Sequence, residues 1–311
     1  MAHKVILDVD TGTDDAVALM LAALSPDIDL IGATTVNGNC PGEVCTENTL
    51  RVFDHIGLDV PVYQGMLDPM VRPDFDRTGG SAVHGLYLDL PPATSKAREP
   101  HAVDWLIETY LASDGDIILA PVGPLTNIAM AMRQQPAILE KIPELVIMGG
   151  SHHFGNRSAS AEFNIWCDPE AAKVVVNCQR PMRMVPLDTT HKALISRDDC
   201  RKLEQLGTPA ATAAATLIEH RIEGYNKEDP MEQPDSAPVH DALVICAIID
   251  PTVIKTELIA VDVETKGELT DGQTVCDFAA RSGTPPNVHF AVDVDLPKFK
   301  EMMFDILGRT A

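Results

Sequence analysis

Four aspartates near the start of the chain have the types and spacing to hold a cation. They lie within residues 8–15 (DVDTGTDD), directly after three apolar residues. Asp8 and Asp10 are two residues apart and point to the same side of a strand, whereas Asp14 and Asp15 fall in the first turn of the following helix. Four like charges this close repel one another and raise each other's pKa. The stretch therefore predicts a divalent metal site at a strand-to-helix corner.

Further polar residues follow later apolar runs. Asn39 and Thr126 each come shortly after a run of the length of a strand, and Glu162 and Asn164 stand at the end of a long loop that follows the run at 145–148. In open α/β sheets, ligands bind at the carboxyl ends of the strands. We therefore expect these side chains to gather with the aspartates at one edge of a sheet.

Most of these residues also have a simpler explanation when each is taken alone. Acids in a first helical turn can serve the helix dipole, and Asn39 can serve a turn. The pair His240-Asp241 stands at an expected helix start, where it can act as a cap. His84 lies in the proline- and glycine-rich stretch 66–100, which looks like a long irregular loop. The joint spacing of the aspartates, rather than any single residue, indicates a site.

The elements that must position these groups alternate between strands and helices, which is typical of a parallel sheet with helices on both faces. Strands are expected at 28–36, 60–63, 116–122, 145–148 and 182–187, and helices at 42–56, 101–112, from 125, at 169–176, 197–227 and 240–249. Runs at 258–263, 274–278 and 288–294 suggest an antiparallel group before a closing helix. The sequence thus predicts one α/β domain over residues 1–311, with a mostly parallel open sheet, helices on both faces and a small antiparallel strand group near the C-terminus.

Composition excludes several classes of partner. The net charge of −22, from 24 basic and 46 acidic residues, argues against nucleic acid and against an anionic membrane. Seven cysteines without a Cys-x-x-Cys pair indicate neither a disulfide framework nor a zinc site, and they fit a reducing compartment. The sequence shows no signal-peptide pattern and no apolar run of about 18 residues, the length that a membrane-spanning helix needs. A soluble, cytoplasmic protein is expected.

Taken together, the motifs resemble those of the nucleoside hydrolases of the inosine-uridine preferring type. The resemblance extends from Val5 to the closing helix. Two positions depart from the family pattern: Thr11 replaces the usual proline, and residues 86–88 (LYL) follow His84-Gly85 in place of Glu-Ser-Gly. The motifs that carry the resemblance are residues 8–16 (DVDTGTDDA), 33–39 (ATTVNGN), 123–129 (GPLTNIA), 147–150 (IMGG), 161–165 (AEFNI), 168–172 (DPEAA), 239–241 (VHD) and 268–272 (ELTDG).

The resemblance implies a Ca²⁺ site beside a ribose site. Ca²⁺ would be held by oxygen atoms of Asp10, Asp15, Asp241 and the backbone carbonyl of Thr126, a set suited to a hard cation. The resemblance also implies a homodimer or homotetramer that acts on nucleosides in salvage. The residues implied to bind the substrate are Asp14, Asn39, Asn156, Glu162 and Asn164 at the ribose hydroxyls, Met148 packed nearby, and His84 and Tyr225 on the base side.

The implied reaction is hydrolysis of the N-glycosidic bond of ribonucleosides to ribose and free base. Cleavage builds positive charge on the sugar, and carboxylates stabilise that oxocarbenium-like state. Asp10 would take a proton from a metal-bound water, and His240, expected to titrate near neutrality, would donate one to the base. Residues 225–235 are expected to form a mobile flap over the base. Histidine at position 240, where the purine-specific branch has tryptophan, favours uridine, then inosine, with cytidine also a candidate.

Two other functions stay open at this point. Asp8-x-Asp10 after a strand is also similar to the first motif of the haloacid dehalogenase type phosphatases, which use the first aspartate as nucleophile and Mg²⁺ as cofactor. That family's later lysine and acidic pair are not placed in this sequence. Alternatively, the chain binds a nucleoside or ribose without cleaving it. Hydrolysis of a nitrophenyl phosphate would favour the phosphatase, and tight binding of uridine without cleavage would favour the binding protein.

Overall fold

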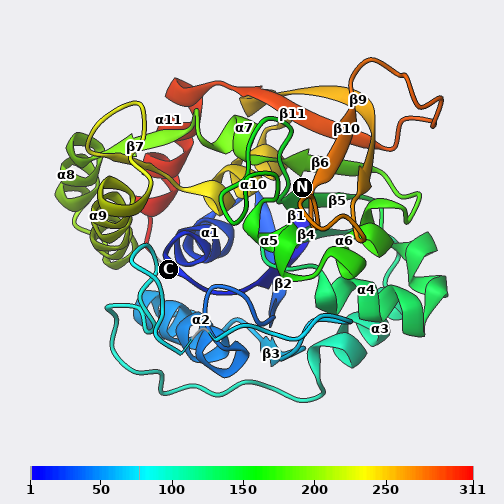
Figure 1. Cartoon of the computed structure of the whole chain (residues 1–311). Coiled ribbons are helices and arrows are strands. Elements are labelled where there is room, and N and C mark those ends of the chain that lie inside the picture. The colour runs from blue at the N-terminus through cyan, green and yellow to red at the C-terminus, as the bar shows by residue number, and fades with distance from the viewer. Residues whose placement is uncertain (1, 77, 311) are drawn as a thin grey trace.

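A sheet of nine strands forms the centre of the structure, a computed structural model that describes residues 2–76 and 78–310 (Figure 1). The strands are β1 (His3–Val9), β2 (Ile28–Thr35), β3 (Val62–Gln64), β4 (Ile117–Pro121), β5 (Leu145–Met148), β6 (Met182–Val185), β9 (Ile254–Val263), β10 (Thr274–Asp277) and β11 (Val288–Val294). Their order is β10-β9-β11-β6-β5-β4-β1-β2-β3. All pairs from β11 to β3 are parallel, whereas β9 pairs antiparallel with β10 and β11. The predicted sheet and its antiparallel group are confirmed.

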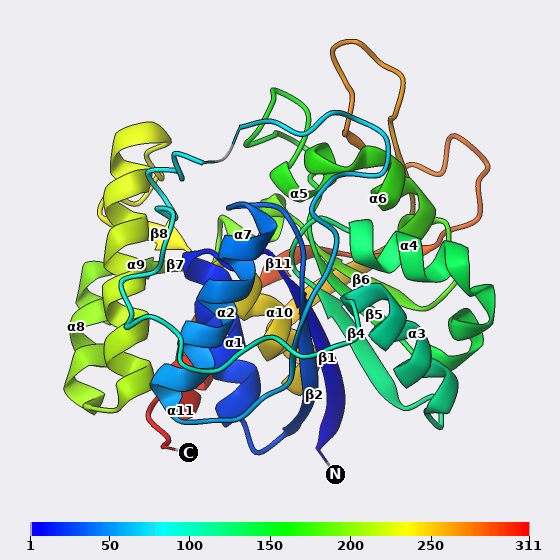
Figure 2. The ribbon, with the colours of Figure 1, turned by 90° about the horizontal axis from the view of Figure 1, so that it is seen from below.

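Helices cover both faces of this sheet. They are α1 (Thr13–Leu24), α2 (Gly42–Ile56), α3 (Ala102–Ala112), α4 (Thr126–Gln134), α5 (Phe163–Cys167), α6 (Pro169–Val176), α7 (Leu187–Thr190), α8 (Arg197–Leu206), α9 (Pro209–Glu228), α10 (His240–Ile249) and α11 (Leu296–Leu307), with short 3₁₀ helices η1 (Pro136–Lys141) and η2 (Pro251–Val253). Figure 2 shows α1 and α2 on one side of β1 and β2, and α3 and α4 on the other.

Alternate residues of β1 enter two different cores, because successive side chains of a strand point to opposite faces. Val5, Leu7 and Val9 pack with α1, α2 and the helices from α8 to α11. Ile6 packs with α3, α4 and α6 on the opposite face. A strand that is buried on both faces needs apolar residues at successive positions, not only at alternate ones. The predicted placement of helices on both faces is therefore confirmed.

The strand order reverses at β1, which lies between β2 and β4. The chain leaves β1 into α1 on one face and leaves β4 into α4 on the other. Such a point opens a crevice beyond the carboxyl ends of the two strands, where ligands bind in this class of sheet. The carbonyl of Asp8 accepts the N–H of Val122 at 2.8 Å, which aligns the ends of β1 and β4. Asp10 and Gly123 thus border the same crevice.

Several local expectations need correction. The helix expected over 197–227 is broken at Gly207, whose φ of 71° ends α8 in the left-handed region that glycine adopts without strain. Strands β7 (Leu194–Ser196) and β8 (Ser236–Pro238) form a second, antiparallel sheet that the sequence pattern did not reveal. The residues 225–235, expected to be a flap, are partly helical, because α9 continues to Glu228.

Among the residues that the structure describes, no helix combines the length and the apolar character needed to cross a membrane.

Candidate active site

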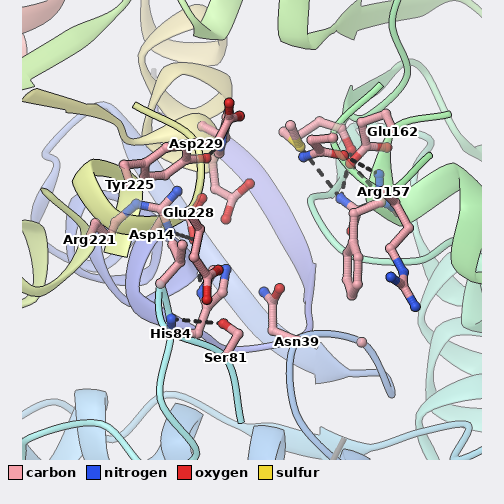
Figure 3. A pocket seen from close by; sticks show the side chains of 18 of the residues that line it. Asp14, Asn39, Ser81, His84, Arg157, Glu162, Arg221, Tyr225, Glu228 and Asp229 are labelled. Carbon is pink, nitrogen blue, oxygen red and sulfur yellow. Dashed lines mark hydrogen bonds and ion pairs between the residues drawn. The ribbon is translucent and has the colours of Figure 1, made fainter. Parts of the chain in front are cut away.

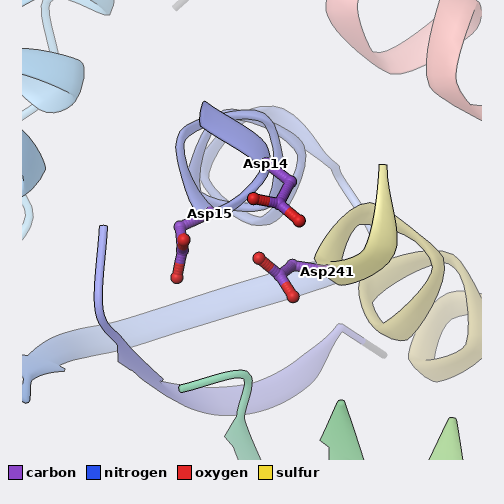
Figure 4. A group of neighbouring side chains, drawn as sticks. All are labelled: Asp14, Asp15 and Asp241. Atoms are coloured by element: carbon purple, nitrogen blue, oxygen red, sulfur yellow. The ribbon is translucent and has the colours of Figure 1, made fainter. Parts of the chain in front are cut away.

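Three carboxylates meet at the crevice. Asp14 and Asp15 lie in the first turn of α1, and Asp241 in the first turn of α10, more than two hundred residues later. One oxygen of each lies within 4.8 Å of the others, and all three residues are buried. Figure 4 shows the carboxylates of Asp14 and Asp241 directed toward each other, with Asp15 beside them. The expected convergence of the two segments is present.

Asp10 lies next to this group and is held by backbone donors. Its Oδ2 accepts the N–H of Asn39 at 2.7 Å, and its own N–H donates to Oδ1 of Asp15 at 3.1 Å. A Cβ at Gly38 or Gly123 would overlap the Asp10 carboxylate. Glycine is therefore required at both positions, because the backbone approaches the carboxylate so closely. The sequence NGN and the glycine after β4 thus build the pocket for Asp10.

Burial and mutual repulsion disfavour the ionised form of these carboxylates and raise their pKa values. Burial, together with the charge of neighbouring Asp14, raises the pKa of Asp15 to about 7. Burial also raises the pKa of Asp10 and of Asp241 well above the ordinary value, again with help from the adjacent carboxylates. A divalent cation would relieve both causes at once. A donor set of buried carboxylate oxygens fits a hard cation such as Ca²⁺.

Of the four residues implied to hold Ca²⁺, two belong to the group of converging carboxylates and two lie outside it. Asp15 and Asp241 belong to the convergent group, in which Asp14 is the third member. Asp10 contacts Asp15 from the side. Thr126 starts α4 and is buried, with its Oγ1 donating to Asp168 at 2.7 Å. The identity of the metal ligands stays a prediction.

A cavity of about 670 Å³ opens above the carboxylates (Figure 3). All the predicted substrate residues line it, together with His240 and Asp241, whereas Asp10, Asp15 and Thr126 are not among the lining residues. The predicted residues in the lining are Asp14, Asn39, His84, Met148, Asn156, Glu162, Asn164, Tyr225, His240 and Asp241. The sequence motifs therefore belong to one site.

Glu162 and Asn164 form one wall of the cavity. Glu162 caps α5: its Oε1 accepts the N–H of Asn164 at 2.9 Å, and its Oε2 accepts the N–H of Gly150 at 3.0 Å. Burial nevertheless raises the pKa of Glu162 to about 7. The Asn164 amide donates to the carbonyl of Val122 at 2.7 Å, which fixes its orientation. Glu162 is therefore both the N-cap of α5 and a lining residue of the cavity.

Two histidines and a tyrosine form the opposite wall. The Nδ1 of His84 accepts the N–H of Thr13 at 3.2 Å, and burial lowers the pKa of His84 to about 4. His240 is buried, and burial together with the Arg221 guanidinium lowers its pKa well below the ordinary value. The expectation that His240 titrates near neutrality is therefore wrong. A neutral imidazole can still donate one hydrogen bond.

Three lining residues that the sequence analysis missed are Phe75, Arg157 and Arg221, whereas Glu228 and Asp229 fall within the segment 225–235 that it expected to lie over the base. A usable signal existed for Arg221, which stands four residues before Tyr225 and therefore on the same helical face. Figure 3 shows Glu228 and Asp229 at the cavity near Tyr225, where α9 ends. Phe75 and Arg157 come from irregular segments, which have no periodicity to predict their direction.

The fold and the site together define an α/β enzyme whose cavity joins a carboxylate cluster to a wall of amide and carboxylate groups. The chain belongs to the inosine-uridine preferring nucleoside hydrolases, whose sequence model matches residues 5–301. It is a ribonucleoside hydrolase, an N-glycosidase. The comparisons favour neither the phosphatase nor the silent binding protein.

Relatives and solved structures agree with this assignment. The pyrimidine-specific ribonucleoside hydrolase RihB of Escherichia coli (strain SE11) is 41% identical over 301 residues, which covers 96% of this chain and 94% of the relative. The purine-preferring ribonucleoside hydrolase from Gardnerella vaginalis has a TM-score of 0.90 at 31% identity, with 98% of each chain covered. A plant nucleoside hydrolase has the same TM-score at 27% identity, with 99% of each chain covered.

Proposed function

We propose that this chain hydrolyses pyrimidine ribonucleosides, with uridine as the preferred substrate, in a Ca²⁺-dependent reaction. The observation that carries the proposal is the placement of buried carboxylates on one side of a single cavity that Glu162 and Asn164 close on another. The 41% identity to proteins named as pyrimidine-specific supports the base preference. Inosine is the second candidate substrate, because the matching family is described as inosine-uridine preferring.

The residues would divide the work between ribose, water and base. Asp14, Asn39, Glu162 and Asn164 would hold the ribose hydroxyls, with Met148 packed against the sugar and Asn156 near the cavity mouth. Negative groups around the sugar stabilise a developing positive charge more than they stabilise a neutral substrate, which is the difference that lowers a barrier. Asp10 would accept the proton of the attacking water.

Asp10, Asp15, Asp241 and the carbonyl of Thr126 would hold Ca²⁺, which would supply fixed positive charge for the ribose diol and for water. On the base side, the Tyr225 hydroxyl would donate a hydrogen bond to the departing base, with His240 bonded to that hydroxyl and His84 lining the same wall. Since the pKa of His240 is lowered, its contribution would be a hydrogen bond from a neutral ring to the Tyr225 hydroxyl rather than a proton from an imidazolium.

The test is to measure release of ribose from uridine, cytidine, inosine and adenosine with Ca²⁺ present. We expect the highest kcat/KM with uridine and the lowest with adenosine. A clear preference for inosine would overturn the pyrimidine assignment while leaving the hydrolase intact. Hydrolysis of 4-nitrophenyl phosphate without ribose release, or tight uridine binding without cleavage, would favour the rival functions.

The resemblance also implies a homodimer or homotetramer, which we retain as part of the proposal. Light scattering coupled to gel filtration would give the mass in solution. A monomeric mass at the enzyme concentrations used in assays would overturn this part alone, because the 33.6 kDa chain contains every residue assigned to the site.

A further inference from the structure

Arg221 is a fully buried cation at the edge of the site. Its side chain has 0% exposure, and its Nη1 donates to Oδ1 of Asp14 at 2.7 Å and to Oγ1 of Thr13 at 3.0 Å. Its Nε donates to the carbonyl of Pro238 at 3.0 Å. A buried charge is costly unless it is paired and hydrogen-bonded. These three bonds therefore hold the guanidinium in one geometry.

Helix α9 places Arg221 by its own packing. Leu217, Arg221 and Tyr225 follow one another at intervals of four, so they share the buried face of the helix. One turn along, a Cβ at Gly224 would overlap the backbone of Ala82 and Val83. The helix is thus pressed against the loop that carries His84, and the arginine has little freedom to move.

The contact with Asp14 is directional. Within the described part of the chain, the hydrogen bonds that Asp14 accepts from Arg221 end on Oδ1. Figure 3 shows the guanidinium beside Asp14 and Tyr225, at the edge of the cavity that these residues line. Figure 4 shows the carboxylate turned toward Asp241. Because the bond from Arg221 uses Oδ1, the other oxygen of Asp14, Oδ2, is available to a ligand in the cavity that Asp14 lines.

The same guanidinium also fixes the base side of the site. Pro238 stands two residues before His240, so its bond to Nε anchors the segment that presents His240 and Asp241. The Tyr225 ring lies 5.6 Å from the guanidinium carbon, within reach of a cation–π interaction. The Arg221 side chain therefore connects Asp14, the proposed ribose ligand, with Tyr225 and the segment that carries His240.

We propose that Arg221 is a positioning residue of the hydrolase: by occupying Oδ1 of Asp14, it fixes the orientation of that carboxylate and aims Oδ2 at a ribose hydroxyl. The inference rests on the proposed function, in which Asp14 binds the ribose. A merely structural arginine would stabilise the fold without affecting how the enzyme distinguishes sugars. The two roles separate when substrates lacking single hydroxyls are compared.

The experiment measures kcat and KM of the wild type, Arg221→Met and Arg221→Lys with uridine, 2′-deoxyuridine and 3′-deoxyuridine. We expect Arg221→Met to lower kcat/KM for uridine by about 100-fold, the cost of misplacing a binding group by about 1 Å. The loss should be much smaller for the deoxy substrate that lacks the hydroxyl bound by Asp14. Arg221→Lys should recover part of the loss, since it restores the charge but not the fork of donors.

A matched control is Arg183→Met, which removes a partly buried arginine that is paired with Glu144 at 2.6 Å and lies outside the cavity lining. It should lower the melting temperature and leave the ratio of uridine to deoxyuridine hydrolysis unchanged. Equal losses on all three substrates, or a wild-type ratio in Arg221→Met, would overturn the inference. If Arg221→Met does not fold, the lysine variant carries the same comparison. Absence of ribose release by the wild type would instead overturn the proposed function.

Discussion

The phenol oxygen of Tyr225 lies 2.9 Å from Nε2 of His240. On the other side of the ring, Nδ1 lies 2.7 Å from Oγ1 of Thr190. Both ring nitrogens are thus engaged by hydroxyls in a buried place, and the pKa of His240 is lowered. A neutral imidazole has one N–H, so the two hydroxyls decide which nitrogen carries it. In the proposed reaction, Tyr225 and His240 would therefore act toward the base as a pair.

Replacing Tyr225 by phenylalanine should weaken assistance to the leaving base. We expect kcat for uridine to fall by about 100-fold, the low end of what a positioned proton donor contributes. A 4-nitrophenyl riboside needs no proton on its leaving group, so its hydrolysis should be nearly unchanged. Tyr110→Phe is the control, because Tyr110 is equally buried but lies outside the cavity lining. Equal losses on both substrates would show that Tyr225 only supports packing.

The pH dependence should report Glu162. Burial raises its pKa to about 7, so the carboxylate that would stabilise positive charge on the ribose in the proposed reaction becomes the main form only above that pH. We expect kcat/KM for uridine to rise as the pH passes through about 7, and Glu162→Gln to lose this limb along with most of the activity. Glu301→Gln, at an exposed glutamate of α11, should keep the wild-type profile.

Raising the pH has the opposite effect on stability: activity should rise, whereas the contribution of Glu162 to the stability of the fold should fall. The folded state binds the Glu162 proton more tightly than the unfolded chain, whose ordinary pKa is 4.5. The carboxyl therefore costs stability increasingly as the pH rises from 4.5 to about 7. Relative to the wild type, Glu162→Gln should gain melting temperature across this window. A constant difference between pH 4 and pH 8 would contradict the raised pKa.

The sequence predicted what depends on local spacing. Asp10, Asp14 and Asp15 could be placed at one corner because a strand and a helix have fixed periods. The joining of Asp241 to this corner depended on the family resemblance, since no spacing links residues more than two hundred positions apart. Arg221 shows the limit: its helix was expected, but its contact with Asp14 arises from the packing of α9 against α1.

The error on His240 has a related cause. A histidine in sequence suggests a group that titrates near neutrality. Its burial and the nearby guanidinium come from α9 and α10, which meet only in the folded chain. Likewise the break at Gly207 could be taken for an ordinary glycine within a helix, because the residues on both sides of it favour helix. The surroundings in the folded chain, rather than the residue type, determine both the lowered pKa of His240 and the end of α8 at Gly207.

Removing metal should destabilise the protein and stop turnover. Four buried carboxylates repel one another, so a bound cation stabilises the folded state, by about 2.7 kcal/mol when it is present at 100 times its Kd. We expect a chelator to lower the melting temperature and Ca²⁺ to restore both stability and uridine hydrolysis. Asp241→Asn should weaken the response to Ca²⁺, whereas Asp305→Asn, exposed on α11, should not. A melting temperature independent of chelator and Ca²⁺ would exclude the site.

The sharpest test of the chemistry is Asp10→Asn. The amide has the same shape, so it can still accept the N–H of Asn39 and fit against Gly38. It cannot take a proton from water, and we expect kcat to fall by about 10²–10⁴-fold, the range for loss of a general base. The melting temperature should hold or rise, because one of the mutually repelling carboxylates is gone.

A matched substitution separates this role from simple loss of charge. Asp8 lies near the end of β1, two residues before Asp10, and is also buried, but its Oδ1 accepts hydrogen bonds from Thr34 at 2.5 Å and Asn127 at 2.7 Å. Asp8→Asn should therefore lower stability more than it lowers kcat. If ribose release from uridine falls equally in the two variants, the charge of the strand end matters and Asp10 is not the base. If Asp10→Asn keeps near-normal kcat, a group other than Asp10 accepts the proton of the attacking water.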